Sequence, residues 1–165
     1  DNGDQVELMK VKITNTGDQE ITLTPTAAIP IYGRSADNLR DHRHVTSLLQ
    51  RIDTNQYGVV VAPTLIFDER GHRENQVAYA VLGTEGQGQP PIGFFPVAEE
   101  FIGEGGSLEW PQKVVENSND FCGAGHQVAG YEAIGALRFA PVRLKPEETK
   151  TYIIIMAIGR HDTDF

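Results

Sequence analysis

The chain has 165 residues, of which 39% are hydrophobic and 22% charged, and its formal net charge is -9 at pH 7. This length suits one domain with a core of its own, and this composition is typical of a globular protein rather than a disordered one. The acidic balance argues against nucleic acid and anionic membranes as partners, because both require a basic surface.

The single cysteine, Cys122, makes an intramolecular disulfide impossible. Because the sequence also shows no secretory signal and no apolar stretch of about 18–20 residues, we predict a cytoplasmic protein. We interpret Cys122 as a half-buried structural thiol rather than a nucleophile, although His126 follows four residues later. The chain begins without Met and ends just after its most hydrophobic segment, so we expect a fragment of a longer polypeptide.

The N-terminal third predicts strands. Residues 6–13 alternate between apolar and polar side chains with one slip at Met9, and a turn leads into the pattern of residues 21–24. These two segments predict a hairpin. Residues 27–32 continue the second strand, and Pro30 indicates a sheet edge or a bend.

The middle of the chain mixes signals. After a polar segment over residues 33–43, the spacing of apolar residues in 44–52 favours a helix. Two strands are predicted next: one over residues 58–67, broken at Pro63, and one over residues 76–83. The only helix predicted with a defined end covers residues 96–102, and the other segments read as loop or irregular structure: 84–92, 108–115 and 116–130.

The segment 131–159 carries the strongest fold signal. Two apolar strands, 131–139 and 152–158, flank a turn that contains Pro146. The second is a nearly continuous hydrophobic run, which is typical of a strand covered on both faces or sealed into a sandwich core. With no repeat and no internal linker, the sequence predicts one all-β domain over residues 1–165, an antiparallel two-sheet sandwich with one short helix.

Several segments resemble the N-terminal β-sandwich of the family 94 glycoside phosphorylases, formerly glycosyltransferase family 36, which include cellobiose and chitobiose phosphorylases and the related cyclic β-1,2-glucan synthases. The block 94–106 is similar to the family's element Asp-Arg-x-x-Phe-x-Gly-x-x-Gly, with Glu99 and Glu100 in place of Asp-Arg. The other segments that carry the resemblance are the first hairpin, the His-containing stretch, the strand and turn after it, and the closing hairpin: 11–23, 41–49, 62–70 and 132–159.

The resemblance implies the large supersandwich fold shared with galactose mutarotases. It also implies a domain without catalytic residues, cofactor or metal, packed on a separate (α/α)6 barrel that carries the catalytic acid and the phosphate site. The parent enzyme would act on β-glucosides with inorganic phosphate as co-substrate, inverting at the anomeric carbon. An oligosaccharide and the barrel are then the expected partners, and a homodimer is compatible with this arrangement.

The polar segment before residue 45 supplies the main candidate binding residues. Arg40, Asp41, Arg43 and His44 offer planar or multi-donor groups that suit sugar hydroxyls or a domain interface. Two further candidates are the sole tryptophan, Trp110, which either stacks on a sugar or packs in a core or interface, and His126. We expect these six residues to shape a sugar-site rim or domain interface and to move no protons.

Three alternatives remain open at this stage. An isolated carbohydrate-binding, lectin-like sandwich would have the same sequence pattern. A mutarotase-like epimerase would use His126 and Glu132 as acid and base, although their short spacing does not suit that family. A metal site on His42 and His44 would need further ligands that the sequence does not indicate.

Overall fold

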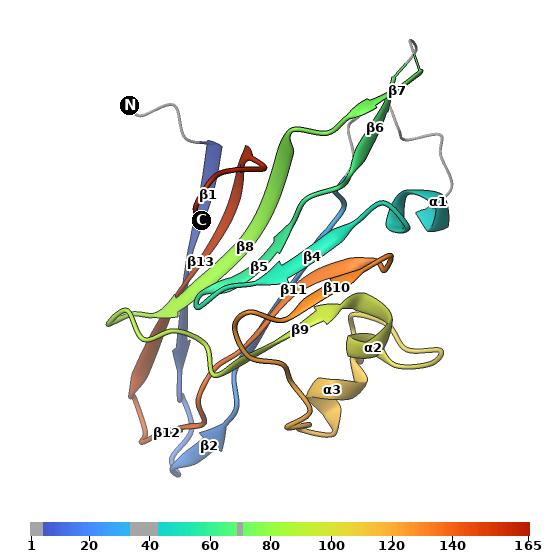
Figure 1. Ribbon diagram of the computed structural model, residues 1–165. Coiled ribbons are helices and arrows are strands. Elements are labelled where there is room, and N and C mark those ends of the chain that lie inside the picture. The colour runs from blue at the N-terminus through green and yellow to red at the C-terminus, as the bar shows by residue number, and fades with distance from the viewer. Residues whose placement is uncertain (1–4, 34–42, 69–70) are drawn as a thin grey trace.

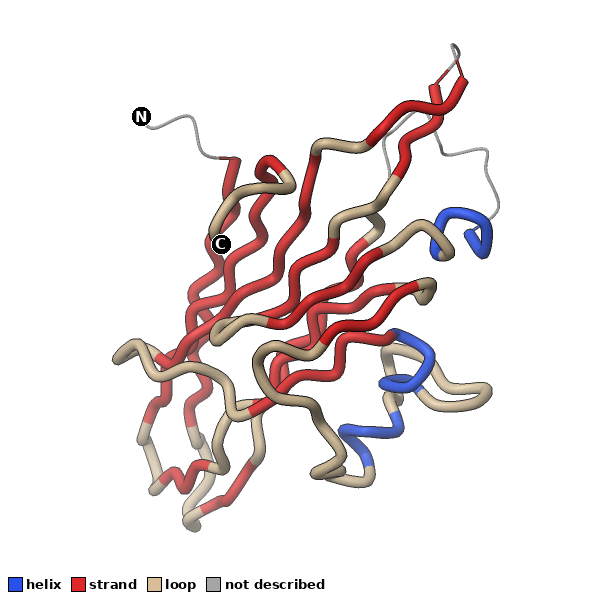
Figure 2. The backbone as a smooth tube through the Cα atoms, viewed as in Figure 1, coloured by secondary structure: helices blue, strands red, loops and turns tan. Residues whose placement is uncertain are grey.

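The computed structural model describes residues 5–33, 43–68 and 71–165 and confirms the predicted all-β, antiparallel sandwich (Figures 1 and 2). Its described strands and helices are β1 (Gln5–Thr14), β2 (Ile21–Leu23), β3 (Thr26–Ile31), α1 (Arg43–Ser47), β4 (Arg51–Thr54), β5 (Gly58–Val61), β6 (Leu65–Asp68), β7 (Gly71–Glu74), β8 (Val77–Glu85), β9 (Gly93–Val97), α2 (Ala98–Ile102), α3 (Gln112–Val115), β10 (Gln127–Ala129), β11 (Ala133–Arg138), β12 (Val142–Leu144) and β13 (Thr149–Arg160). The described residues thus contain three short helices. The sequence predicted the second, over 96–102, and favoured a helix over 44–52, of which only the part up to Ser47 is helical.

Two sheets form the sandwich. The larger has six strands in the order β1-β13-β8-β5-β4-β10, and the smaller has three in the order β3-β11-β9. As Pro30 indicated, β3 lies at an edge. Two short pairs complete the topology: β12 with β2, and the hairpin of β6 and β7, which projects from the rest of the fold (Figure 1). The break predicted at Pro63 separates β5 from β6.

The two predicted hairpins at the ends of the chain are wrong. β1 pairs with β13, and β2 pairs with β12, so the first and last strands form one ribbon that crosses from the large sheet to the small one. Asn15 stabilises the bend: its buried side-chain amide donates to the carbonyls of Gln19 (2.8 Å) and Leu144 (2.9 Å). β1 and β2 follow each other in sequence but do not pair with each other. Each pairs with a strand more than a hundred residues further along the chain.

The main core lies between the two sheets, and a second apolar cluster lies between the small sheet and α2. As a result β11 is buried on both faces, and it contains Gly135, where an added Cβ would come within 2.2 Å of Val81 Cβ. β13 instead alternates between buried and less buried positions. The doubly covered strand is thus β11, and the hydrophobic run 152–158 is part of the wall of the core.

The helix predicted over residues 96–102 begins two residues later, at Ala98. Residues 93–97 form β9, and α2 follows and ends at Gly103, whose φ of 81° favours glycine. Residues 112–115, predicted as irregular, form the single turn α3, and the predicted loop 116–130 contains β10. Elements of three or four residues carry too few periodic positions for the sequence pattern to reveal them.

The buried Arg138 at the end of β11 holds α3 and the following loop against the small sheet. Its guanidinium donates to Asn117 Oδ1 (3.0 Å) and to the carbonyl oxygens of Lys113 (2.9 Å) and Ser118 (3.3 Å). It also lies 5.4 Å from the centre of the Phe95 ring. Burial lowers the pKa of Arg138, as expected for a desolvated cation.

Candidate functional site

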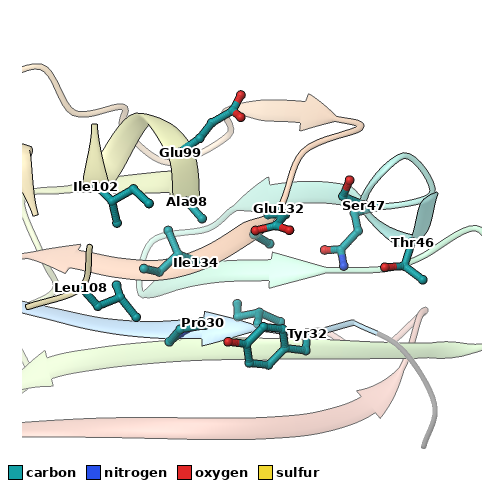
Figure 3. Close-up of a pocket in the computed structure, with 13 residues that line it drawn as sticks. Pro30, Tyr32, Thr46, Ser47, Ala98, Glu99, Ile102, Leu108, Glu132 and Ile134 are labelled. Atoms are coloured by element: carbon teal, nitrogen blue, oxygen red, sulfur yellow. The ribbon is translucent and has the colours of Figure 1, made fainter. Parts of the chain in front are cut away.

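A pocket of about 120 Å³ opens at one end of the sandwich, where α1 and α2 approach β3 and β11 (Figure 3). Figure 3 shows apolar side chains on one side, among them Ile102, Leu108 and Ile134, and polar ones on the other. The full lining is Pro30, Ile31, Tyr32, Thr46, Ser47, Gln50, Ala98, Glu99, Ile102, Leu108, Glu132, Ala133 and Ile134.

The polar side of the pocket comes from α1 and the turn that follows it. Thr46, Ser47 and Gln50 are all buried. Gln50 has a fixed backbone, because its N–H donates to the Ser47 carbonyl (3.0 Å) and its own carbonyl accepts from Gly130 N–H (3.0 Å). Its side-chain Oε1, however, has no hydrogen-bond partner among the described residues. A buried acceptor left unpaired costs free energy, so this oxygen calls for a donor.

The helix α1 is amphipathic in the reverse sense to a normal surface helix. Thr46 and Ser47 point inward with 7% exposure each. Val45, within α1, and Leu48, which follows it directly, are 50% and 65% exposed. A surface helix usually buries its apolar face and leaves its polar face in water. This inversion suits a helix whose polar side faces a ligand pocket and whose apolar side meets another surface.

Two carboxylates line the pocket, but they do not converge. Figure 3 shows the carboxylate of Glu99 turned away from that of Glu132, and the Glu99 side chain is exposed. Glu132 is half-buried, and its backbone carbonyl accepts from the first N–H of α2, that of Ala98 (2.9 Å). An acid–base pair for glycoside cleavage would need both carboxyl groups directed at one bond. No Lys, Arg or His is among the described lining residues.

The sequence matches the family described as glycosyl hydrolase 94, supersandwich domain, over residues 1–164. The chain belongs to this family. A comparison with curated proteins finds no match. The family agrees with the resemblance inferred from the sequence and with the antiparallel two-sheet architecture of this supersandwich domain.

The structure describes only some of the six residues predicted to form a sugar-site rim or domain interface. Arg40 and Asp41 lie outside the described residues, as does His42 of the metal alternative. Arg43 and His44 begin α1, the helix that supplies Thr46 and Ser47 to the pocket, but their side chains lie outside what the structure describes.

Trp110 lies in the loop between α2 and α3, two residues after the pocket residue Leu108. Its backbone N–H donates to the Ser107 carbonyl (3.1 Å), which closes a tight turn around Leu108. The indole is 70% exposed, so packing in the core of the domain is excluded. An exposed tryptophan close to a pocket is available for a sugar face or for another domain.

His126 does not belong to the pocket. Its backbone N–H donates to Thr54 Oγ1 (2.9 Å), at the opposite end of β4 from Gln50. Thr54 follows Gln50 by four positions of nearly extended chain, a span of about 13 Å. Because Glu132 lines the pocket with Gln50, the acid–base pair of His126 and Glu132 is not formed.

Cys122 behaves as predicted for a structural thiol. It is half-buried, its Sγ donates to the Phe94 carbonyl (3.3 Å), and burial raises its pKa, which disfavours the thiolate. In the part of the chain that the structure describes, no three His, Cys, Asp or Glu side chains are grouped as metal ligands would be. No helix among the described residues has the length and apolar character to cross a membrane.

Sequence reasoning missed the residues that form the pocket. The apolar spacing in residues 44–52 favoured one helix, but the helix α1 ends at Ser47, and the structure buries Thr46, Ser47 and Gln50 as well as Ile52. Because Gln50 lies beyond the end of α1, helical spacing does not relate it to Thr46, and no local pattern indicated this polar surface. Its burial could not be inferred, because it depends on β11 and α2 far along the chain.

Proposed function

We propose that this chain is the non-catalytic supersandwich domain of an inverting glycoside phosphorylase or related glycosyltransferase that acts on β-glucosides. The domain packs against an (α/α)6 barrel and borders its sugar site. The observation that carries the proposal is the family match over residues 1–164. It is supported by the divergence of Glu99 and Glu132, which leaves the pocket without a pair of converging carboxylates.

The end of the domain that carries the pocket is the side we assign to the barrel. Exposed apolar side chains lie on the elements around the pocket: Val45, Leu48, Leu108 and Trp110. Apolar groups of this size on a surface favour contact with another protein surface. In this arrangement the pocket faces the sugar site, and inorganic phosphate binds on the barrel, since the described pocket lining offers no cation.

A freestanding carbohydrate-binding module is the second candidate, favoured by the exposure of Trp110 beside the pocket. Such a module would bind cello- or laminari-oligosaccharides at full strength without a barrel. A domain that borders a shared site would instead bind weakly alone and more tightly when joined to the barrel, because the barrel supplies the remaining contacts.

The proposal is tested by assaying phosphorolysis of β-linked disaccharides with inorganic phosphate, first with this chain alone and then with the chain joined to the barrel of its parent protein. We expect no sugar phosphate from the chain alone and turnover from the joined protein. Leu48→Asp, which places a charge on the exposed apolar side of α1, should weaken the association of the two parts. Sugar phosphate released by the chain alone would refute the non-catalytic role.

A further inference from the structure

We infer that the α1–α2 pocket binds a single neutral sugar ring, with Gln50 Oε1 as the acceptor that selects a hydroxyl. This deepens the proposed function and rests on it for the place of the pocket beside a sugar site. The inference itself is carried by the chemistry of the pocket: an apolar wall, an unpaired buried acceptor, a volume that encloses one edge of a ring and the absence of a described cation.

The two sides of the pocket match the two kinds of surface on a pyranose. A sugar ring presents C–H groups on its face and O–H groups along its edge. Ile102, Leu108 and Ile134 form a wall for the C–H face, and Thr46 and Ser47 lie across from them (Figure 3). Pockets of this composition, mostly apolar with a few polar groups, are typical of small-molecule sites.

Gln50 supplies the polar specificity. The residue is 5% exposed, and its Oε1 is the only unpaired buried side-chain oxygen of the described residues that lies on this pocket. An amide oxygen accepts hydrogen bonds only, so the ligand must donate. A site built to hydrogen-bond a hydroxyl discriminates strongly against ligands that lack it, because the buried acceptor is otherwise left unpaired.

Volume and charge narrow the ligand class. About 120 Å³ is less than the roughly 150 Å³ of an apolar protein cavity that accommodates benzene, so the pocket encloses one edge of a single pyranose and the rest of the ring lies outside the mouth. The described lining holds carboxylates and no cationic side chain, so anions such as phosphate are disfavoured. A neutral polyhydroxylated ring satisfies all of these conditions.

The inference is tested by calorimetric titration of the chain with three probes: methyl β-glucopyranoside, cyclohexylammonium and inorganic phosphate. We expect the glucoside to bind in the millimolar range and more tightly than the other two. Gln50→Leu should weaken glucoside binding about tenfold, the loss of one hydrogen bond. The matched control, Gln127→Leu on the exposed edge strand β10, should leave the affinity unchanged.

A second variant guards against a folding defect at Gln50. Leu108 is half exposed, so Leu108→Ala should fold normally and reduce glucoside affinity several-fold through the apolar wall. The inference is overturned if no glucoside binding is detected, if Gln50→Leu binds as well as the unaltered chain, or if cyclohexylammonium or phosphate binds more tightly. These outcomes leave the non-catalytic role intact, because phosphorolysis decides that role separately.

Discussion

Gln50, which directly precedes the short strand β4, and Thr54, its last residue, are nearly equally buried, with 5% and 4% exposure. Thr54 Oγ1 donates to the Gly123 carbonyl (2.7 Å) and accepts from His126 N–H (2.9 Å), so its polar group is satisfied. Gln50 Oε1 has no partner within the described structure. Burial alone therefore does not mark a ligand site. A buried polar group is a candidate only where it is both unpaired and on a pocket, as Gln50 Oε1 is and the core hydroxyl of Tyr152 is not.

The largest effect should follow from removing the buried guanidinium of Arg138, which donates three hydrogen bonds. Arg138→Met keeps much of the side-chain volume but leaves Asn117 Oδ1 and the Ser118 carbonyl without a donor, and the Lys113 carbonyl with only the Ser118 N–H. We expect a loss of about 3 kcal/mol in the free energy of unfolding, measured by urea denaturation. Arg143→Met, at an exposed position of β12, is the matched control and should change stability little. Equal effects of the two variants would contradict a structural role for Arg138.

Thr54→Val tests the satisfied end of β4. The variant is close in shape but removes the hydroxyl that pairs with the Gly123 carbonyl and the His126 N–H, both on exposed residues. We expect a loss of about 1 kcal/mol by urea denaturation, the net contribution of a hydrogen bond. Thr22→Val, at an exposed position of β2, serves as the control. A neutral Thr54→Val would mean that hydrogen-bond satisfaction does not distinguish Thr54 from Gln50.

Tyr152 provides an unpaired buried hydroxyl on the core side of β13, away from the pocket. Burial, assisted by the negative charge of Glu85, raises its pKa from 10.0 to about 12. The folded protein therefore holds this proton more tightly than the unfolded chain does. The resulting stability is complete below about pH 10 and is lost as the pH rises toward 12.

Tyr152→Phe should consequently unfold at nearly the same urea concentration as the unaltered chain near neutral pH, since no hydrogen bond is lost. Between pH 10 and 12 the variant should lose less stability than the unaltered chain, because it has no phenol to deprotonate. Parallel pH profiles for the two proteins would show that Tyr152 does not titrate in this way.

The smallest effect on stability is expected at Gln50, which directly precedes β4. Gln50→Leu removes an oxygen that has no described partner, so the free energy of unfolding should stay within about 0.5 kcal/mol or rise. Thermal unfolding measured without ligand checks this. A loss comparable with that of Thr54→Val would show that Gln50 is a structural residue and would remove the basis for a ligand site.

The sequence was sufficient to predict those structural features that depend on neighbouring residues alone. The interruption at Pro63, the strand that became β8 and the edge position of Pro30 follow from side-chain periodicity and proline chemistry. The pairing of β1 with β13 does not, because it joins residues at opposite ends of the chain. A local pattern specifies that a strand exists but not which distant strand completes its hydrogen bonds.

The pocket residues could not be predicted from the sequence for a related reason. Polar residues such as Gln50 are usually exposed, so their burial cannot be predicted without the elements that cover them. Of the charged and aromatic candidates, His126 lies near Thr54 and Trp110 lies in the loop beside Leu108. The prediction for Arg43 and His44 stays a prediction, because their side chains lie outside the described residues.

The most direct test of the proposed site is whether a sugar contacts the pocket around Gln50 or the region around Thr54. Titration of the isotope-labelled chain with methyl β-glucopyranoside, followed by backbone amide NMR, locates the ligand residue by residue. We predict that shifts concentrate on Ser47, Gln50, Leu108 and Ile134, with little change at Thr54 and His126. Shifts centred on Thr54 and His126, or no shifts at all, would contradict the account.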